Sequence, residues 1–200
     1  MIFQKVNLIE KTARKIQVAL YQKGLYAKKT FNDILYKSPK MEKLLTTAKQ
    51  FAQSNSNILI YGETGTGKEH FAQQIRQQFP QNLPFISINC GAIPTELMES
   101  ELFGHKKGSF TGATQDKQGL IQSAHGGSLF LDEVAELPLS MQVKLLRAVQ
   151  EKRIRPVGSD AEIDVDFRVI SASHQDLEAL VQQGKFRQDL FFRIHVMDLV

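Results

Sequence analysis

A short glycine-rich segment offers the clearest chemistry in this 200-residue sequence. It consists of Gly62-Glu63-Thr64-Gly65-Thr66-Gly67-Lys68-Glu69. The first seven residues match the pattern G-x-x-x-x-G-K, in which backbone N–H groups turn toward phosphate oxygens and lysine adds a positive charge. Such a loop needs a buried strand before it and a helix after it, because the helix N-terminus also attracts phosphate. The pattern predicts a nucleotide phosphate site, and the alternative is a glycine-rich turn with a surface lysine.

The last residue of this segment departs from the general pattern. Ser or Thr usually occupies the position and contacts Mg²⁺ through its hydroxyl group. Glu69 cannot take over that role, so we expect metal positioning to depend more on water and on other acidic side chains. The difference argues against a generic GTPase.

Two carboxylates follow an apolar run farther along the chain. Asp132 and Glu133 come directly after Leu129-Phe130-Leu131. In nucleotide hydrolases an aspartate at such a strand end holds Mg²⁺, and a neighbouring glutamate can polarise the attacking water. An acidic turn after a buried strand is the alternative, but the upstream phosphate loop favours hydrolysis of a nucleoside triphosphate.

The apolar pattern places these residues on a parallel sheet. Short apolar runs predict buried strands over residues 58–61, 85–88, 128–131 and 167–172. Helical periodicity follows the N-cap and proline pair Ser38-Pro39 for about four turns, and further helices are predicted over residues 67–79, 139–151 and 175–183. Strands that alternate with helices in this way predict an α/β fold whose sheet is covered on both faces.

Composition excludes several other classes of protein. A hydrophobic content of 42% and a charged content of 23% are typical of a folded globular domain. The single cysteine, Cys90, excludes an intrachain disulfide, and the five histidines are too scattered for a zinc site. No apolar run is long enough to span a membrane, so we expect a cytoplasmic chain without a membrane partner.

The basic charge is concentrated in an N-terminal arm, residues 1–31. Residues 1–30 hold seven basic side chains and one acidic one, whereas the remainder of the chain is slightly acidic. We therefore do not infer nucleic-acid binding from the net charge of +4. Apolar residues between Ile2 and Leu20 recur at helical spacing. They predict a helix that packs on its own domain or pairs with a second chain as a coiled coil.

Three further segments point to a family. They are Glu101-Leu102-Phe103-Gly104-His105, Gly108-Ser109-Phe110-Thr111-Gly112-Ala113, and Phe186-Arg187-Gln188-Asp189-Leu190-Phe191-Phe192-Arg193. With the phosphate loop and Gly126-Gly127-Ser128, they resemble the AAA+ central domain of bacterial enhancer-binding proteins, the ATP-driven activators of sigma-54 RNA polymerase. The resemblance covers about residues 32–200. It implies a P-loop NTPase fold of the AAA+ class, a three-layer α/β/α arrangement with a parallel sheet.

A closer resemblance rests on the six-residue loop 108–113. The family usually has alanine where this chain has Ser109. That serine, with Lys106-Lys107 before it and Asp116-Lys117-Gln118-Gly119 after it, is similar to the two-component regulators that activate transcription of type IV pilin.

The resemblance also implies roles for single residues. Lys68 would bind the β- and γ-phosphates of ATP, Asp132 the Mg²⁺–water complex, and Glu133 would activate water. Asn89 matches an asparagine that restrains the catalytic glutamate, although an amide that caps a turn is the alternative. Ser173 falls on the sensor of the γ-phosphate. The family commonly has Thr-Asn there, and the next residue here is a histidine, for which an ordinary strand-end position is the alternative.

Two arginines match residues that act between subunits. Arg187 and Arg193 resemble the arginine fingers that reach the neighbouring subunit's site, where a guanidinium neutralises charge on the transferred phosphoryl group. The alternative is a pair of arginines on a solvated helix face. The resemblance implies a homo-oligomeric ring, by family a hexamer, and a monomer with almost no activity.

The loop Gly108 to Ala113 would contact sigma-54. Phe110 and Thr111 lie between two glycines, so we expect an exposed aromatic ring and hydroxyl at the tip. We also expect the chain to end before the helical lid of the family and to lack its receiver and helix-turn-helix modules, hence to bind no DNA directly. An active sigma-54-coupled ATPase and a catalytically impaired nucleotide-binding or interaction module both remain open. An unrelated AAA+ unfoldase is disfavoured by the loop.

Overall fold

The computed structural model describes residues 37–77 and 83–199. The arm predicted over residues 1–31, including its helix, lies outside the described residues. Within the described ranges, no helix combines the length and apolarity that a membrane span requires.

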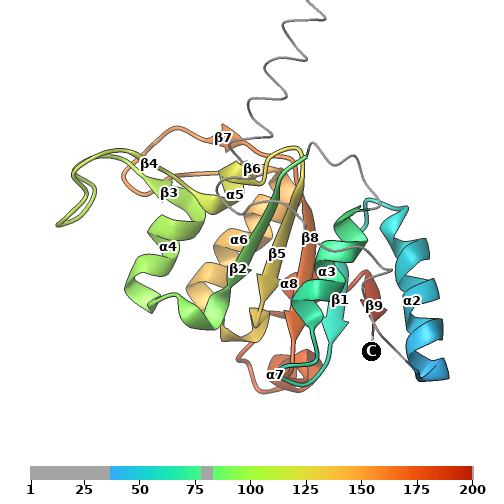
Figure 1. Cartoon of the computed structure of the whole chain (residues 1–200). Coiled ribbons are helices and arrows are strands. Elements are labelled where there is room, and N and C mark those ends of the chain that lie inside the picture. The colour runs from blue at the N-terminus through green and yellow to red at the C-terminus, as the bar shows by residue number, and fades with distance from the viewer. Residues whose placement is uncertain (1–36, 78–82, 200) are drawn as a thin grey trace, which may run out of the picture.

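A five-stranded parallel sheet forms the centre of the fold (Figure 1). Its strands are β1 (Ile58–Tyr61), β2 (Phe85–Asn89), β5 (Ser128–Asp132), β8 (Arg168–Ser173) and β9 (Met197–Leu199), in the order β2-β5-β8-β1-β9. The register places Asn89 opposite Asp132 and Tyr61 opposite Ser173. The carboxyl ends of four strands therefore meet at one edge, where ligands bind in open α/β sheets.

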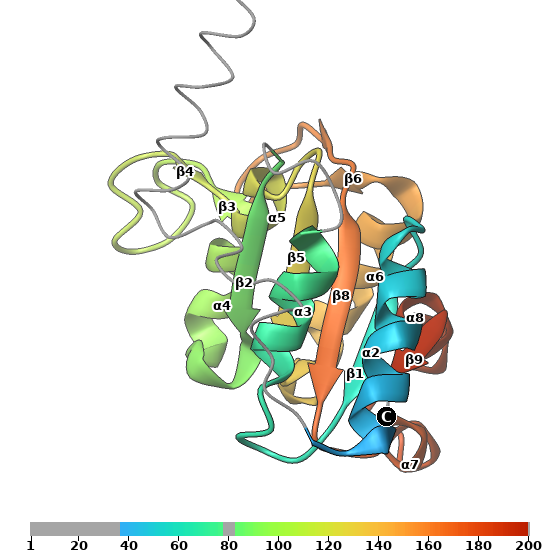
Figure 2. The ribbon, with the colours of Figure 1, turned by 45° about the vertical axis from the view of Figure 1, so that its right-hand side comes forward.

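Helices cover both faces of the sheet. The helices α2 (Pro39–Ala52) and α3 (Lys68–Gln77) pack on one face, with Ile58 and Ile60 of β1 pointing toward them. Leu59 points to the other face, which α4 (Thr95–Phe103), α6 (Leu139–Glu151), α7 (Leu177–Gln182) and α8 (Gln188–Ile194) cover. This alternation is what a strand buried on both sides requires. The predicted three-layer α/β/α fold is confirmed, as both views show (Figures 1 and 2).

The remaining elements are short. Within the described part of the chain, η2 (Cys90–Ala92), η3 (Val134–Glu136) and α5 (Leu120–Ser123) are one-turn helices. Two antiparallel hairpins are formed by β3 (Gly104–His105) with β4 (Lys117–Gln118) and by β6 (Arg153–Ile154) with β7 (Ile163–Asp164).

Candidate nucleotide site and recognition loop

The residues predicted to handle the nucleotide gather at the carboxyl edge of the sheet. The glycine-rich loop follows β1, Asn89 ends β2, Asp132 ends β5 and Ser173 ends β8. The backbone N–H of Gly62 donates to the carbonyl oxygen of Ser173 at 3.2 Å, which joins the loop to the end of β8. Sheet register alone thus places the loop beside the predicted sensor position.

The loop has the backbone shape that phosphate binding needs. Gly65 and Gly67 have φ angles of +82° and +87°, which L side chains rarely adopt. A Cβ atom at Gly65 would meet nothing within 4 Å, so this side of the loop is open to a ligand. The helix α3 begins at Lys68, whose Nζ donates to the carbonyl oxygens of Gly62 and Glu63, both at 2.9 Å. The ammonium group is therefore held against the loop that it is expected to serve.

An apolar cavity adjoins this loop. It has a volume of ≈ 220 Å³ and lies between the loop and α2, lined by Met41, Leu44, Tyr61 and Phe71 together with loop residues. Apolar walls next to a phosphate cradle suit the flat base of a nucleotide.

The two acidic residues differ in backbone conformation. Asp132 closes β5, and its Oδ1 accepts a hydrogen bond from the backbone N–H of Glu133 at 3.0 Å. Glu133 has a φ of 52°, in the left-handed region. A non-glycine residue in that region costs on the order of 1 kcal/mol and is concentrated at functional sites. The fold thus turns Glu133 out of line with the strand.

Gly91 provides the space that Glu133 occupies. A Cβ atom there would lie 2.4 Å from Glu133 Oε2 and 3.4 Å from Asn89 Oδ1, so both side chains converge above this glycine. Gly91 could not be predicted from local sequence, because its importance depends on Glu133, 42 positions away. Its place directly after the strand-end pair Asn89-Cys90 was the available signal.

Asn89 also caps the turn that follows β2. Its Oδ1 accepts from the backbone N–H of Ala92 at 3.1 Å, the contact expected of the turn-capping alternative. A restraint of Glu133 by Asn89 stays a prediction. Cys90, the residue after Asn89, is buried. Desolvation raises the pKa of its thiol to about 12, and the charges of Asp132 and Glu133 add smaller effects in the same direction.

The sensor position is occupied by a hydroxyl that is already bonded. Ser173 is buried, and its Oγ donates to the carbonyl oxygen of Gln175 at 2.7 Å and accepts from the Gln175 N–H at 3.0 Å. His174 is exposed. Gln175 Nε2 also donates to Glu136 Oε1 at 2.6 Å, which ties this turn to the segment after the two acids.

Glu69 contacts β2, which is an edge strand of the sheet. Its Oε1 accepts from Ser87 Oγ at 3.2 Å and from Gln73 Nε2 at 3.4 Å. This carboxylate therefore links the start of α3 to the sheet, a role that a serine or threonine hydroxyl would be too short to fill.

The two arginines lie at opposite ends of α8. Arg187 precedes α8 and pairs with Asp189 through Nε–Oδ1 at 3.0 Å and Nη2–Oδ2 at 2.6 Å. This hydrogen-bonded guanidinium holds the pKa of the Asp189 carboxyl below its usual range. The carbonyl oxygen of Arg193 accepts from Asn57 Nδ2 at 2.9 Å. Asn57 precedes β1 and the phosphate loop follows it, so about 16 Å of strand separates Arg193 from that loop.

The loop 106–116 connects β3 to β4 and projects from the domain beside α4 (Figure 1). Phe110 is 40% exposed, with its ring edge-on to His105 at a centroid distance of 4.9 Å, and Thr111 is also exposed. The predicted display of these two side chains is confirmed. Ala113, by contrast, is buried at the base of the loop. Asp116 pairs with Lys106 Nζ at 2.7 Å and closes the loop at its root.

This loop rests on the hairpin β6–β7, which sequence analysis did not predict. The N–H of Lys106 donates to the carbonyl of Val157, and the N–H of Val157 donates to the carbonyl of Gly104, both at 2.9 Å. A Cβ atom at Gly158 would lie 2.5 Å from Ser109 Cβ, so the two backbones approach closely. Ser109 Oγ is buried there without a hydrogen-bond partner among the described residues.

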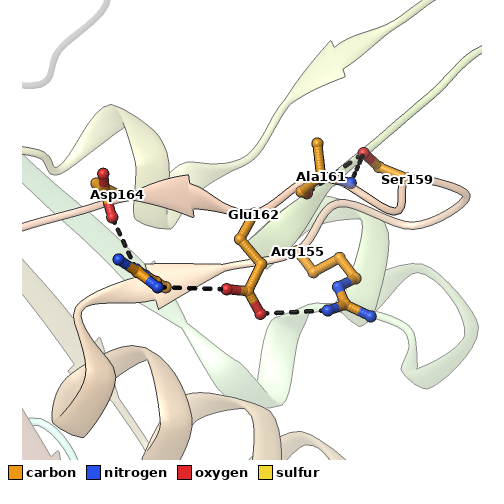
Figure 3. Close-up of polar contacts among 6 residues, drawn as sticks. Arg155, Ser159, Ala161, Glu162 and Asp164 are labelled. Atoms are coloured by element: carbon orange, nitrogen blue, oxygen red, sulfur yellow. Dashed lines mark hydrogen bonds and ion pairs between the residues drawn. The ribbon is translucent and has the colours of Figure 1, made fainter.

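Ion pairs hold the hairpin in shape (Figure 3). Arg153 Nε pairs with Asp164 at 3.0 Å, and Glu162 bridges Arg155 at 3.2 Å and Arg153 at 3.9 Å. Exposed pairs of this kind each contribute at most about 1 kcal/mol, but a shared carboxylate fixes the geometry of the turn. The hairpin is thus a support for the loop 106–116.

A parallel sheet with a glycine-lysine loop after β1 and an acidic pair after β5 defines a P-loop nucleoside triphosphatase fold. The sequence model of the Sigma-54 interaction domain family matches residues 34–200. The chain belongs to this family, the AAA+ domain of sigma-54 activators.

Full-length relatives are considerably longer than this chain. Response regulator protein PilR of Pseudomonas aeruginosa is 56% identical over 169 residues, which are 84% of this chain and 38% of PilR. Transcriptional regulatory protein GlrR of Escherichia coli is 52% identical over 83% of this chain and 38% of its own length. The chain thus spans less than half of the length of these two relatives.

Solved structures show the same fold. The crystal structure of NtrX from Brucella abortus in complex with ATP has a TM-score of 0.78 and 34% identity, covering 96% of this chain and 41% of NtrX. The complex of NtrX with ADP has a TM-score of 0.77, also with 34% identity.

Proposed function

We propose that this chain binds and hydrolyses ATP and uses the cycle to remodel sigma-54 RNA polymerase through the loop 108–113. One observation carries the proposal: the phosphate loop, Asp132, Glu133 and Ser173 converge at one edge of the sheet, while Phe110 and Thr111 stay exposed on a separate braced loop. A solved relative that binds ATP supports the choice of nucleotide. The strong identity with PilR supports a role in pilin transcription.

The chain's residues divide the work of hydrolysis. The backbone of Gly65 and Gly67 surrounds the phosphates, Lys68 neutralises the β- and γ-phosphates, and the cavity beside α2 takes the base. Glu133 orients and deprotonates the attacking water, and Asn89 and Ser173 report whether the γ-phosphate is present. Arg187 and Arg193 act in the site of the next subunit of a homo-oligomeric ring.

The donor set also fits Mg²⁺ bound with the nucleotide. Among residues 37–77 and 83–199, no group of three or more His, Cys, Asp or Glu side chains is placed to hold a metal alone. Mg²⁺ keeps several waters and needs only one or two carboxylates when phosphates supply the other ligands. Asp132 is the residue that would hold it, and the bound ion would neutralise charge on the phosphates.

A pair of variants tests the nucleotide half of this proposal. Lys68→Ala should weaken binding of a fluorescent ATP analogue at least tenfold, whereas Glu133→Gln should bind normally and lose at least a hundredfold in turnover. Turnover should rise cooperatively with protein concentration. A flat zero at all concentrations, with intact ATP binding, would identify the alternative: a nucleotide-binding or interaction module without catalysis.

The sigma-54 half is tested on the exposed loop. Phe110→Ala or Thr111→Ala should leave hydrolysis largely intact but abolish sigma-54 binding in a pull-down with an ATP transition-state analogue. Transcription activation at the wild-type level by Phe110→Ala would refute the assignment of this loop.

A further inference from the structure

Phe192 is an apolar side chain that its own domain leaves mostly uncovered, although its ring centroid lies 5.5 Å from that of Phe191. The helix α8 buries Leu190, Phe191 and Ile194, yet Phe192 is 64% exposed, more than any other large hydrophobic residue in the described ranges. A single exposed phenylalanine is ordinary. This one, however, directly precedes Arg193, which the proposed function places at a contact between subunits.

A groove of matching chemistry lies at the other side of the molecule. It has a volume of ≈ 390 Å³ and runs between β2 and α4, with walls formed by Ile88, Ile93, Pro94, Leu97 and Leu120. Leu97 is 45% exposed within it. The lining includes Asn89, the register partner of Asp132, so the groove reaches the candidate catalytic edge.

The two features cannot meet within one chain. The strand β2 is one edge of the sheet, and α8 leads into β9, the opposite edge. Figure 2 shows α4 and α8 on opposite sides of the molecule. An apolar knob and an apolar groove on opposite sides are complementary only in a head-to-tail contact, the kind that closes into rings.

Charge favours the same pairing. Among the described residues that line the groove, Glu101 is the charged one, and it also pairs with Lys117. The knob is followed by a basic residue, Arg193. Electrostatic complementarity of this kind sets the register of an interface more than its affinity.

We propose that Phe192 of one copy inserts into the β2–α4 groove of the next copy and anchors the head-to-tail contact. The inference rests on the proposed function, because it assumes that Arg193 acts across this contact. A buried aromatic anchor at the centre of an interface typically dominates its binding energy. The seated Phe192 would also hold Arg193 beside the candidate catalytic edge of the next copy.

Two charge variants test the contact from both sides. Phe192→Asp removes the knob and Leu97→Asp blocks the groove, and assembly is measured by sedimentation velocity with a non-hydrolysable ATP analogue. Each variant alone should raise the concentration for half-assembly at least tenfold. An equimolar mixture should form heterodimers but no rings, because each heterodimer contains one intact knob seated in one intact groove. Leu139→Asp, at a 48% exposed leucine that lines neither feature, should assemble as wild type.

Cross-linking tests the pairing directly. With Cys90 replaced by alanine, Phe192→Cys combined with Leu97→Cys should give a ladder of oligomers on oxidation, whereas each single variant should give none. A dimer from Phe192→Cys alone, normal assembly of Phe192→Asp, or a wild-type chain that stays monomeric would each overturn the inference.

Nucleotide binding separates this inference from the proposed function. Binding of the fluorescent ATP analogue depends on the loop of the same chain, so Phe192→Asp should keep it within about twofold of wild type. Loss of binding in the wild-type chain would instead contradict the proposed function.

Discussion

At the residue scale, a substitution at Gly91 tests the proposed role of Glu133. In Gly91→Ala, the new methyl would lie 2.4 Å from Glu133 Oε2, and the carboxylate, the far end of a flexible side chain, must move away. The fold should tolerate the change, because Gly91 does not have a positive φ. We expect turnover to fall at least tenfold with ATP affinity unchanged. Steady-state kinetics and fluorescent-ATP titration measure the two effects, and a variant with wild-type turnover would show that Glu133 acts from another position.

The raised pKa of the Cys90 thiol predicts that the free energy of unfolding depends on pH. Its pKa of about 12 in the fold exceeds the ordinary value of 9.0, so above pH 9 the unfolded chain loses the thiol proton first. Proton release then favours unfolding, and the stabilisation present below pH 9 is lost progressively toward pH 12. At pH 10 the loss is about 1 kcal/mol.

Urea denaturation at pH 8 and pH 10 measures this effect. The fall in unfolding free energy between the two pH values should be about 1 kcal/mol smaller for Cys90→Ala than for wild type. Equal slopes for the two proteins would mean that the thiol ionises as easily in the fold as in the unfolded chain.

Residues whose chemistry depends on local order could be predicted from the sequence. The loop 62–68 and the pair Asp132-Glu133 form short contiguous patterns beside strand ends, and parallel strands bring such ends together without further information. Gly91 and Gln175 escaped notice because their contacts, to Glu133 and Glu136, are between segments far apart in the chain.

At the scale of elements, the hairpin β6–β7 determines how the loop 106–116 is presented. Two constraints act on Gly158. Its φ of +73° disfavours any side chain, and its close approach to Ser109 leaves no room for a Cβ atom. Gly158→Ala should cost at least ~1 kcal/mol from the backbone and should displace the loop as well. We expect sigma-54 binding to fall at least fivefold while ATP binding is unchanged.

Gly184→Ala is the matched control for this change. Gly184 has a φ of +70° but nothing within 4 Å of its Cβ position, so the substitution carries the backbone strain without the collision. Thermal denaturation should show a loss of stability for both variants, at least as large for Gly158→Ala as for Gly184→Ala, and only Gly158→Ala should lose sigma-54 binding. Equal binding by both would show that the hairpin does not support the loop.

Long elements were predictable and short ones were not. The helix 139–151 and the strand 58–61 have the predicted bounds, and the helix expected over residues 67–79 is described as α3 over Lys68–Gln77. The two helices show the helical period in their apolar residues, and the strand is a continuous apolar run bounded by turn residues. The two-residue strands of β3–β4 and β6–β7 have no period, and their pairing depends on tertiary contacts such as Val157 with Gly104.

At the scale of the whole molecule, the fold separates the residues that the proposed function assigns to hydrolysis. Arg193 lies beside the amino end of β1, and the phosphate loop and Glu133 lie at the carboxyl edge. A guanidinium cannot span about 16 Å of strand to serve its own loop. If Arg193 takes part in hydrolysis, it must therefore do so in another copy, and activity becomes a property of the assembly.

Mixing two inactive variants tests this consequence. Glu133→Gln lacks the base but keeps the arginine, and Arg193→Ala lacks the arginine but keeps the base. Removal of an arginine finger costs about a thousandfold or more in rate, so each variant alone should be nearly silent. In an equimolar mixed ring, about a quarter of the contacts join an intact site to an intact arginine, so turnover should recover to about a quarter of the wild-type value. A mixture of Glu133→Gln with the double variant Glu133→Gln/Arg193→Ala should stay silent, because no site retains its base. If the first mixture gives only the sum of its two components, Arg193 does not act across the contact, and its exposed position on α8 has no catalytic consequence.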